Sequence, residues 1–243
     1  MSIHSGKPNS ITNRAEEYLE TILNMTIEGQ DVVAARLAER LEVSAPTVSA
    51  ALRRLKRDEL IDVNGTHISL TEVGYREAVR IVRRHRLVER LLIDYLGIDW
   101  ADVHEEACLL EHAISPLVEE RLFDKLGHPK TCPHGNPIPS GSIIDLPECE
   151  PLSIQSEGAV IDIVRVTEEV SDNHEMMRFL QENSLIPGFR YRVSASSRPA
   201  GTLTLETMDG SHSVVLAINV AESLFVAPSI TPTTASTAEV PGA

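Results

Sequence analysis

The chain has 243 residues, which exceeds one average domain, so two or three compact units are expected. Hydrophobic residues make up 42% of it and aromatic residues only 4%, which predicts mainly aliphatic cores. No stretch approaches the ~20 apolar residues of a membrane helix, and the first ten residues lack the apolar block of a signal peptide. These features predict a soluble, cytoplasmic protein without a membrane partner.

The charge is unevenly distributed along the chain. Residues 1–90 carry 14 Lys and Arg against 13 Asp and Glu, a net charge of +1, whereas residues 91–243 carry 8 against 23, a net charge of −15. Basic side chains suit phosphate contacts, so the N-terminal part is the candidate for binding nucleic acid. The three cysteines are widely spaced and form no disulfide framework, as is typical of a reducing compartment.

The N-terminal pattern predicts a winged helix-turn-helix. Apolar residues recur at helical spacing over residues 14–25, 32–40 and 46–56. Two short alternating segments, residues 60–63 and 67–70, then flank Asn64-Gly65, a pair that favours a type I′ hairpin turn. Helix, turn, helix and hairpin follow one another in the order of a winged DNA-binding unit.

The helix over residues 46–56 is the predicted recognition helix. Short polar side chains near its start can approach base edges, and cations near its end can hold phosphates. The predicted DNA-binding residues are Ser44, Pro46, Thr47, Ser49, Arg53, Arg54 and Lys56. A three-helix core with solvated arginines, or a winged helix that contacts protein, is the alternative.

The rest of the chain predicts two long helices, a loop and a small β domain. The helices cover residues 72–96 and 100–126, and proline, glycine and polar residues follow over residues 127–157. Strand-like segments at 160–166, 191–195, 202–205 and 214–218, with a helix at about 173–183, indicate a five-stranded, barrel-like domain. Residues 229–243 have the composition of a disordered tail.

Ligand-type side chains gather on the second long helix. At 100° per residue, His104, Cys108, Glu111 and His112 fall within roughly 100° of arc. Taken singly, Cys108 is more simply a small core residue, and a His85–Glu89 pair at i,i+4 spacing is more often a surface ion pair. Four such residues on one face favour a site for a divalent first-row metal.

At this point the chain resembles the diphtheria-toxin-repressor family of iron- and manganese-dependent repressors over roughly residues 12–228. The resemblance is carried by residues 16–22, 44–49, 84–90, 106–112 and 135–139. It implies two metal sites per subunit for Fe²⁺ or Mn²⁺, with Zn²⁺, Co²⁺ or Ni²⁺ as substitutes in vitro. The implied primary site comprises Glu17, Glu20, Cys108, Glu111 and His112, and the implied ancillary site comprises His85, Glu89, His104 and Glu168.

This chain combines features of two branches of that family. Acidic residues at positions 17 and 20 are similar to the manganese branch, whereas Cys108 is similar to the iron branch. Ser171 stands where the iron branch has a Gln ligand, and the neighbouring Asp172 could take its place. The metal is therefore left open between Fe²⁺ and Mn²⁺, with a slight preference for Fe²⁺.

The expected fold is mainly α with small β parts. We expect a winged helix-turn-helix at residues 1–76, a helical dimerisation and metal-sensing domain at 77–142, a linker at 143–157 and, from the resemblance, an SH3-like β-barrel at 158–228. The expected homodimer interface consists of Leu87, Leu91, Leu92, Ile114, Leu117 and Val118.

The expected function is a metal-activated transcriptional repressor of genes for metal uptake, acting as a homodimer on double-stranded operator DNA, with one or two dimers on each operator. Two alternatives remain: a winged-helix regulator that answers a small organic effector, and a metalloenzyme with an open coordination position. No separate acid, base or nucleophile supports the enzyme.

Overall fold

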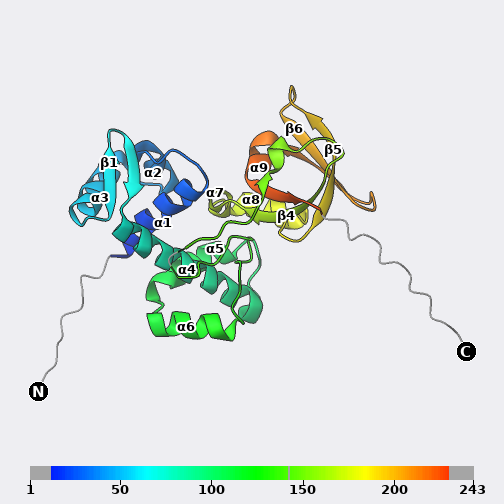
Figure 1. Cartoon of the computed structure of the whole chain (residues 1–243). Helices are drawn as coiled ribbons and strands as arrows, with labels where there is room; N and C mark the ends of the chain where they lie inside the picture. Colours follow the sequence, from blue (N-terminus) through cyan, green and yellow to red (C-terminus); the bar gives the residue numbers. More distant parts are fainter. Residues whose placement is uncertain (1–11, 142, 230–243) are drawn as a thin grey trace, which may run out of the picture. The chain divides into compact units, whose positions relative to one another are not determined.

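The computed structural model describes residues 12–141 and 143–229, and the chain divides into two compact units (Figure 1). The first comprises the described residues up to Pro147 together with Val166–Ser184, and the second comprises Glu148–Arg165 and the residues from Leu185 onward. The segment Val166–Ser184 thus packs with the first unit, although the expected third domain spans it. None of the described helices is both long enough and apolar enough to cross a membrane.

The first unit begins with the predicted helix-turn-helix and wing. Its elements are α1 (Asn13–Ile27), α2 (Ala34–Arg40), α3 (Ala45–Arg57), β1 (Ile61–Asn64) and β2 (His67–Leu70). The side chain of Ser44 caps α3 by accepting a hydrogen bond from the backbone amide of Thr47, and Pro46 lies in the first turn, as the sequence predicts. The core beneath these elements is aliphatic apart from Tyr18.

The wing turn differs from the prediction by one position. Asn64 pairs with His67, so Gly65 and Thr66 form the turn. Only Gly65 of these two has a positive φ, at 63°. A type I′ turn requires a positive φ at both central residues, so the predicted type I′ turn at Asn64-Gly65 is wrong.

The helix α4 (Glu72–Leu96) follows the wing and is the longest helix of the described residues. Thr71 caps its first turn, and Gly97 ends it in the left-handed conformation at φ 67°. Gly74 allows a close approach, because a Cβ placed there would lie 1.8 Å from the backbone oxygen of Leu60. The start of α4 is therefore packed directly against the backbone that enters the wing.

The single helix expected at 100–126 is wrong. The chain forms α5 (Val103–Leu110), a 3₁₀ turn η1 (Glu111–Ala113) and α6 (Pro116–Lys125). Pro116 lacks the amide that a continuous helix needs, and Ser115 caps the new helix instead. Two short helices, α7 (Glu168–Ser171) and α8 (His174–Glu182), complete the unit.

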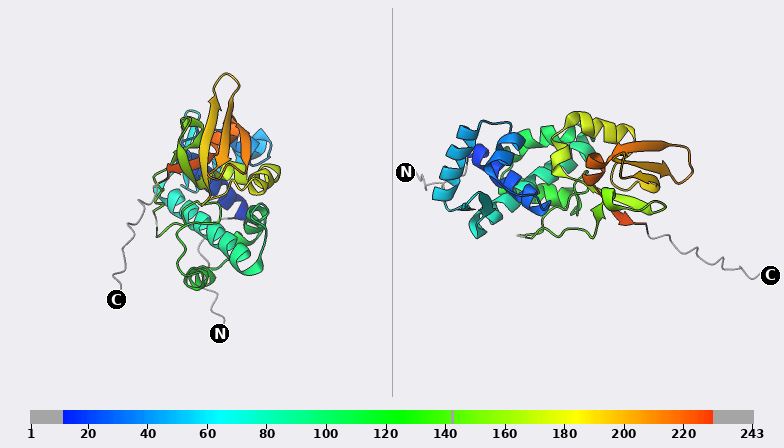
Figure 2. Two further views of the ribbon diagram at one scale, coloured as in Figure 1. Left: turned by 90° about the vertical axis from the view of Figure 1, so that its right-hand side faces the viewer. Right: turned by 90° about the horizontal axis from the view of Figure 1, so that it is seen from above.

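The second unit is a six-stranded sheet in the order β3-β8-β4-β5-β6-β7. Its strands are β3 (Glu150–Pro151), β4 (Val160–Val166), β5 (Arg190–Ser197), β6 (Thr202–Thr207), β7 (Ser213–Ala217) and β8 (Leu224–Pro228), accompanied by η2 (Leu152–Ile154) and α9 (Ile218–Glu222). Burial alternates along β7 and β8, which places one face on the core. The β5–β6 hairpin extends beyond the other strands (Figure 2). The four predicted strands are confirmed in type, but the expected number of five strands is wrong, because β3 and β8 bring the sheet to six.

Candidate metal centre

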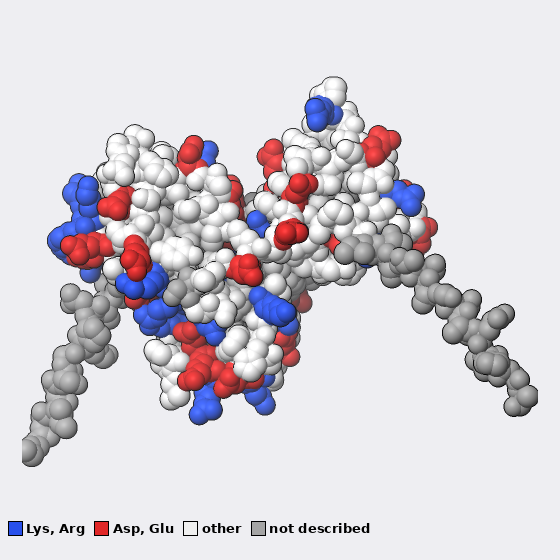
Figure 3. Space-filling view, in the orientation of Figure 1, with Lys and Arg blue, Asp and Glu red and all other residues white. Residues whose placement is uncertain are grey.

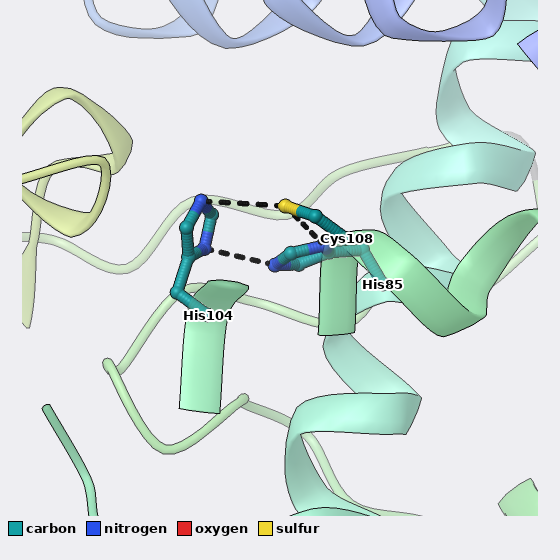
Figure 4. A group of neighbouring side chains, drawn as sticks. All are labelled: His85, His104 and Cys108. Carbon is teal, nitrogen blue, oxygen red and sulfur yellow. Dashed lines mark hydrogen bonds between the residues drawn. The ribbon is translucent and has the colours of Figure 1, made fainter. Parts of the chain in front are cut away.

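The metal centre is built where α4 and α5 pack against each other in the first unit. His85 lies on α4, and His104 and Cys108 lie one turn apart on α5, so the three side chains converge (Figure 4). Nε2 of His85 lies 3.1 Å from Nδ1 of His104. The Sγ atom of Cys108 lies 3.7 Å from Nε2 of His104 and 4.0 Å from Nδ1 of His85.

The buried carboxylate of Glu89 lies among three imidazole rings. Its Oε1 atom is 3.2 Å from Nε2 of His85, 3.5 Å from Nδ1 of His104 and 2.9 Å from Nδ1 of His134. Two donor atoms bonded to one ion at about 2.1 Å, with angles of 90–110°, lie about 3.0–3.4 Å apart. The donor set therefore has the spacing of a coordination shell, and its imidazole and carboxylate chemistry fits a divalent first-row cation.

His134 belongs to this group, although the sequence analysis did not predict it. The ring is fully buried, and its Nε2 atom lies 3.1 Å from the backbone oxygen of Trp100. This contact leaves Nδ1 to face Glu89, with which it makes a buried contact of 2.9 Å. A signal was present in the spacing Cys132-x-His134, next to the loop used only for the family resemblance.

A second set of donors lies on the other side of His85. Oε2 of Glu111 is 2.7 Å from Nδ1 of His85, and Oε1 of Glu111 is 3.4 Å from Nε2 of His112. A carboxylate oxygen of Glu20, on α1, lies within 4.8 Å of the donor atoms of His85 and Glu111. His85 thus faces the predicted primary residues with one ring nitrogen and the ancillary residues with the other.

Neighbouring residues of α1 differ in their placement. Glu16 rather than Glu17 contacts His112, with Oε2 2.7 Å from Nδ1 of that ring. Glu17 is more exposed and lies 3.6 Å from Arg14. A cavity of about 220 Å³ is nevertheless lined by most of the predicted ligands, namely Glu17, Glu20, His104, Cys108, Glu111, His112, Glu168 and Asp172.

The two predicted residues near α7 make different contacts. The carboxylate of Glu168 accepts hydrogen bonds from Nε and Nη2 of Arg86, at 3.2 and 2.7 Å, instead of facing the histidines. Oδ1 of Asp172 lies 3.1 Å from Nε2 of His104, the ring nitrogen that faces away from Glu89. Ser171 bonds the backbone oxygen of Thr167.

The electrostatics favour the negatively charged form at Cys108 and Glu89, whereas burial and the neighbouring Glu111 raise the pKa of Glu20 well above its ordinary value. Desolvation by the surrounding protein raises the pKa of the Cys108 thiol, but hydrogen bonds with His104 and His85 outweigh it and bring the pKa to about 7. Burial would likewise raise the pKa of Glu89, but His134 and His85 hold that pKa well below its ordinary value. Close to neutral pH the cluster therefore holds an ionised carboxylate and a readily ionised thiol, as metal ligation requires.

The candidate DNA interface lies on α3. All seven predicted DNA-binding residues, from Ser44 to Lys56, are exposed. Lys and Arg side chains gather at the edge of the molecule occupied by α3 (Figure 3). The hydroxyl of Ser44 is engaged in capping, and that of Thr47 lies 2.8 Å from it.

The predicted dimer residues fall into two groups. Leu87 and Leu92 are buried inside the unit, and Leu91 and Ile114 are partly buried. Leu117 and Val118 on α6 are exposed, at 63% and 44%, and so are Leu109 at 74% and Leu110 at 42% on α5. Of the predicted dimer residues, Leu117 and Val118 therefore offer exposed apolar surface to a partner, together with Leu109 and Leu110 on α5.

Comparison with known proteins assigns both parts of the first unit. Residues 10–67 match the family model "Iron dependent repressor, N-terminal DNA binding domain", and residues 71–140 match "Iron dependent repressor, metal binding and dimerisation domain". The iron-dependent repressor IdeR of Mycobacterium leprae is 38% identical over 231 residues, covering 90% of this chain and 98% of the relative. The diphtheria toxin repressor of Corynebacterium diphtheriae is 36% identical over 176 residues, covering 72% and 74%.

Solved structures agree with these matches. A manganese-dependent transcriptional repressor in complex with manganese superposes with a TM-score of 0.81 at 34% identity, covering 88% of this chain and 99% of that chain. IdeR of T. acidophilum superposes with a TM-score of 0.75 at 26% identity, covering 91% and 100%. One similar structure, ScaR, is described with bound Zn²⁺.

Proposed function

The chain belongs to the iron-dependent repressor family, and from that premise we propose how its own residues make a metal-dependent, DNA-binding transcriptional repressor. The family consists of repressors and not of enzymes, so the metalloenzyme alternative is set aside. The cations are Fe²⁺ or Mn²⁺, and the partners are operator DNA and a second copy of the chain. We place the protein in the cytoplasm, where it meets both DNA and the cellular pool of metal.

The observation that carries the proposal is the convergence of α1 with α5 and η1 around one cavity. Glu17 and Glu20 belong to the first helix of the DNA-binding part, whereas Cys108, Glu111 and His112 follow α4. A bound divalent cation supplies the positive charge that offsets the repulsion among these carboxylates and the thiolate. We propose these five residues as the primary site, with Glu16 orienting His112.

For the ancillary site we propose His85, Glu89 and His104, and we add His134. The buried contact of 2.9 Å between Nδ1 of His134 and Oε1 of Glu89 supports that addition. Cys132 is not added, because among the described residues its thiol belongs to none of the groups of donor atoms that lie close enough together to hold an ion. Glu168 and Asp172 are less favoured candidates for ancillary ligands. Both line the cavity, but Glu168 accepts a hydrogen bond from Arg86 and Asp172 contacts His104.

Ligation across these elements would hold α1 in one orientation relative to α4 and thereby fix α3 for the major groove. We propose that a homodimer then presents two copies of α3, about one helical turn of DNA apart, and that exposed Ser49, Arg53 and Lys56 contact the DNA. Occupancy of one operator by two dimers, and control of metal-uptake genes, belong to the same proposal. The mixed donor set suits both metals, with a slight preference for Fe²⁺ because of the thiolate.

Substitution of primary ligands tests the proposal. Glu17→Ala and His112→Ala should each reduce the gain in DNA affinity that Mn²⁺ or anaerobic Fe²⁺ produces, whereas Glu175→Ala, an exposed change on α8, should not. The probe is a duplex selected from a random library in the presence of Mn²⁺. If both ligand variants keep the gain of the parent protein, the primary assignment is wrong. An organic effector would be favoured instead if calorimetry detected no stoichiometric metal binding.

A further inference from the structure

One side chain of the DNA-binding part is joined to the metal centre through a single carboxylate. Arg40, the last residue of α2, directs its Nε atom to Oδ2 of Asp172 at 3.3 Å. The other oxygen of Asp172 lies 3.1 Å from Nε2 of His104. Nδ1 of the same His104 ring faces Glu89 and His85. A continuous chain of contacts therefore runs from the ligand cluster through His104 and Asp172 to α2.

The side chain of Arg40 is largely buried and lies near several carboxylates. Its side chain is 11% exposed, and its Nη1 atom lies 3.6 Å from Glu28, whose side chain is 3% exposed. Glu169 lies 3.9 Å from the same atom. Arg40 and Glu28 form the buried part of this cluster, and there the loss of one charge leaves the other uncompensated, whereas the side chains of Asp172 and Glu169 are exposed to solvent. Because the buried Arg40 directs Nε to Asp172, the positions of the two side chains depend on each other.

The segment that bears Asp172, residues 167–172, is held from both sides. Towards the DNA-binding part, the backbone amide of Glu168 donates to Oε1 of Glu28 at 2.7 Å, and the side-chain amide of Gln30 donates to Glu169 at 2.6 Å. Towards the metal centre, Arg86 holds the carboxylate of Glu168 at 2.7 Å.

The backbone just before this segment is anchored as well. The amide of Val166 donates to the backbone oxygen of His134 at 2.9 Å. The segment thus connects the ligand cluster to α1 and α2, and it lies outside both matched family domains, 10–67 and 71–140.

We propose that Arg40 is a positioning residue that couples the metal centre to the DNA-binding helices through Asp172. The proposal rests on the proposed function. A ring that coordinates through Nδ1 is oriented by the partner of its other nitrogen, so Asp172 holds His104 in the ligating orientation. Because the second oxygen of Asp172 binds Arg40, the arrangement of the ligands and the placement of α2 favour each other. Such coupling acts in both directions.

The test measures operator affinity by fluorescence anisotropy with saturating Mn²⁺ and with chelator, on a duplex selected from a random library in the presence of Mn²⁺. Arg40→Gln should shrink the Mn²⁺-induced gain in affinity roughly tenfold, while affinity in chelator stays unchanged. Arg40→Lys keeps a positive charge near Glu28 but lacks the Nε donor, so its Mn²⁺-induced gain in affinity should also be reduced. Calorimetry without DNA should show weaker Mn²⁺ binding to Arg40→Gln, as reciprocity requires.

The matched control is Arg36→Gln, which removes the same charge from an exposed position one turn earlier on α2. It should leave the Mn²⁺-induced gain in DNA affinity intact. The double variant Arg40→Gln/Asp172→Asn should lose no more of the gain than Asp172→Asn alone.

If Arg40→Gln keeps the full Mn²⁺-induced gain in operator affinity, as Arg36→Gln should, the inference is overturned. A parent protein without any Mn²⁺ gain would contradict the proposed function instead, before any variant is compared.

Discussion

At the scale of single residues, the centre depends on ionised groups held close together. The thiol of Cys108, ordinarily with a pKa near 9, has a pKa of about 7 because contacts with His104 and His85 outweigh desolvation. The pKa values of His85 and His104 are raised well above the ordinary value, since carboxylates and the thiol outweigh the effect of burial. Metal-free protein therefore holds protons that a cation has to displace.

Alkylation of Cys108 should follow this pKa. In metal-free protein the rate with iodoacetamide should rise through about pH 7 and level off above it, because the thiolate exists above the lowered pKa and is lost below it. Cys132 is 3% exposed with a raised pKa and should stay unmodified. Peptide mapping by mass spectrometry separates the two sites. A midpoint near pH 9 for Cys108, or an alkylation rate that Mn²⁺ does not lower, would contradict the assignment of Cys108 as a metal ligand.

Replacement of His134 should weaken metal binding. His134→Phe keeps a ring of similar size but removes the nitrogen that faces Glu89, so Mn²⁺ affinity measured by calorimetry should fall by at least roughly tenfold. His128→Phe is the matched control, because the His128 side chain is 63% exposed and contacts Asp124 and Phe123 rather than the donor cluster. Equal Mn²⁺ affinity in the two variants would remove His134 from the site.

The sequence could predict ligand types that share a helix face, but it could not predict contacts that the tertiary fold creates. His104 and Cys108 converge as their spacing indicates. Glu16 contacts His112 although the family motif points to Glu17, because the rotation of α1 relative to η1 decides which neighbour faces the ring. His134 reaches Glu89 from a loop, and local periodicity carries no information about such a contact.

At the scale of elements, the junction between wing and α4 illustrates what periodicity leaves out. The apolar pattern predicts α4 at residues 72–96, and the structure confirms it. The close approach of Gly74 to Leu60 depends on the path of the wing and is not visible in that pattern. Conversely, Ser115 and Pro116 mark the start of α6 within the single helix expected at 100–126.

Gly74→Ala should destabilise the first unit. A Cβ at this position would lie 1.8 Å from the backbone oxygen of Leu60, and neither backbone can move without disturbing the wing. We expect a loss of about 2–3 kcal/mol in the free energy of unfolding, measured by urea denaturation. Val73→Ala, at an exposed neighbour, is the control and should change stability little. A Gly74→Ala protein as stable as the parent would show that the junction is looser than described.

At the scale of the whole molecule, the exposed apolar side chains indicate where a second copy binds. Leu117→Glu on α6 should shift the protein from dimer to monomer in sedimentation experiments, because a charge would be buried in the interface. Val215→Glu, an equally exposed position on β7 of the second unit, should leave the dimer intact. If Leu117→Glu sediments as the parent does, the interface lies elsewhere.

Much of the order of helices and strands was predictable because local patterns and a family resemblance agreed. The helix-turn-helix, the long α4 and four strands followed from periodicity and turn residues. The grouping of Val166–Ser184 with the first unit did not, since this segment is held by hydrogen bonds between α7 and residues more than 80 positions earlier: Gln30 and Arg86 donate to it, and Glu28 accepts from it.

Operator affinity measured with and without metal tests the central claim most directly. Full-length protein is titrated into the labelled duplex with chelator, with Mn²⁺ and with anaerobic Fe²⁺, at one fixed salt concentration. Ligation that links α1 to α5 predicts tight binding with either ion and at least tenfold weaker binding with chelator. Equal affinity in all three conditions would contradict it.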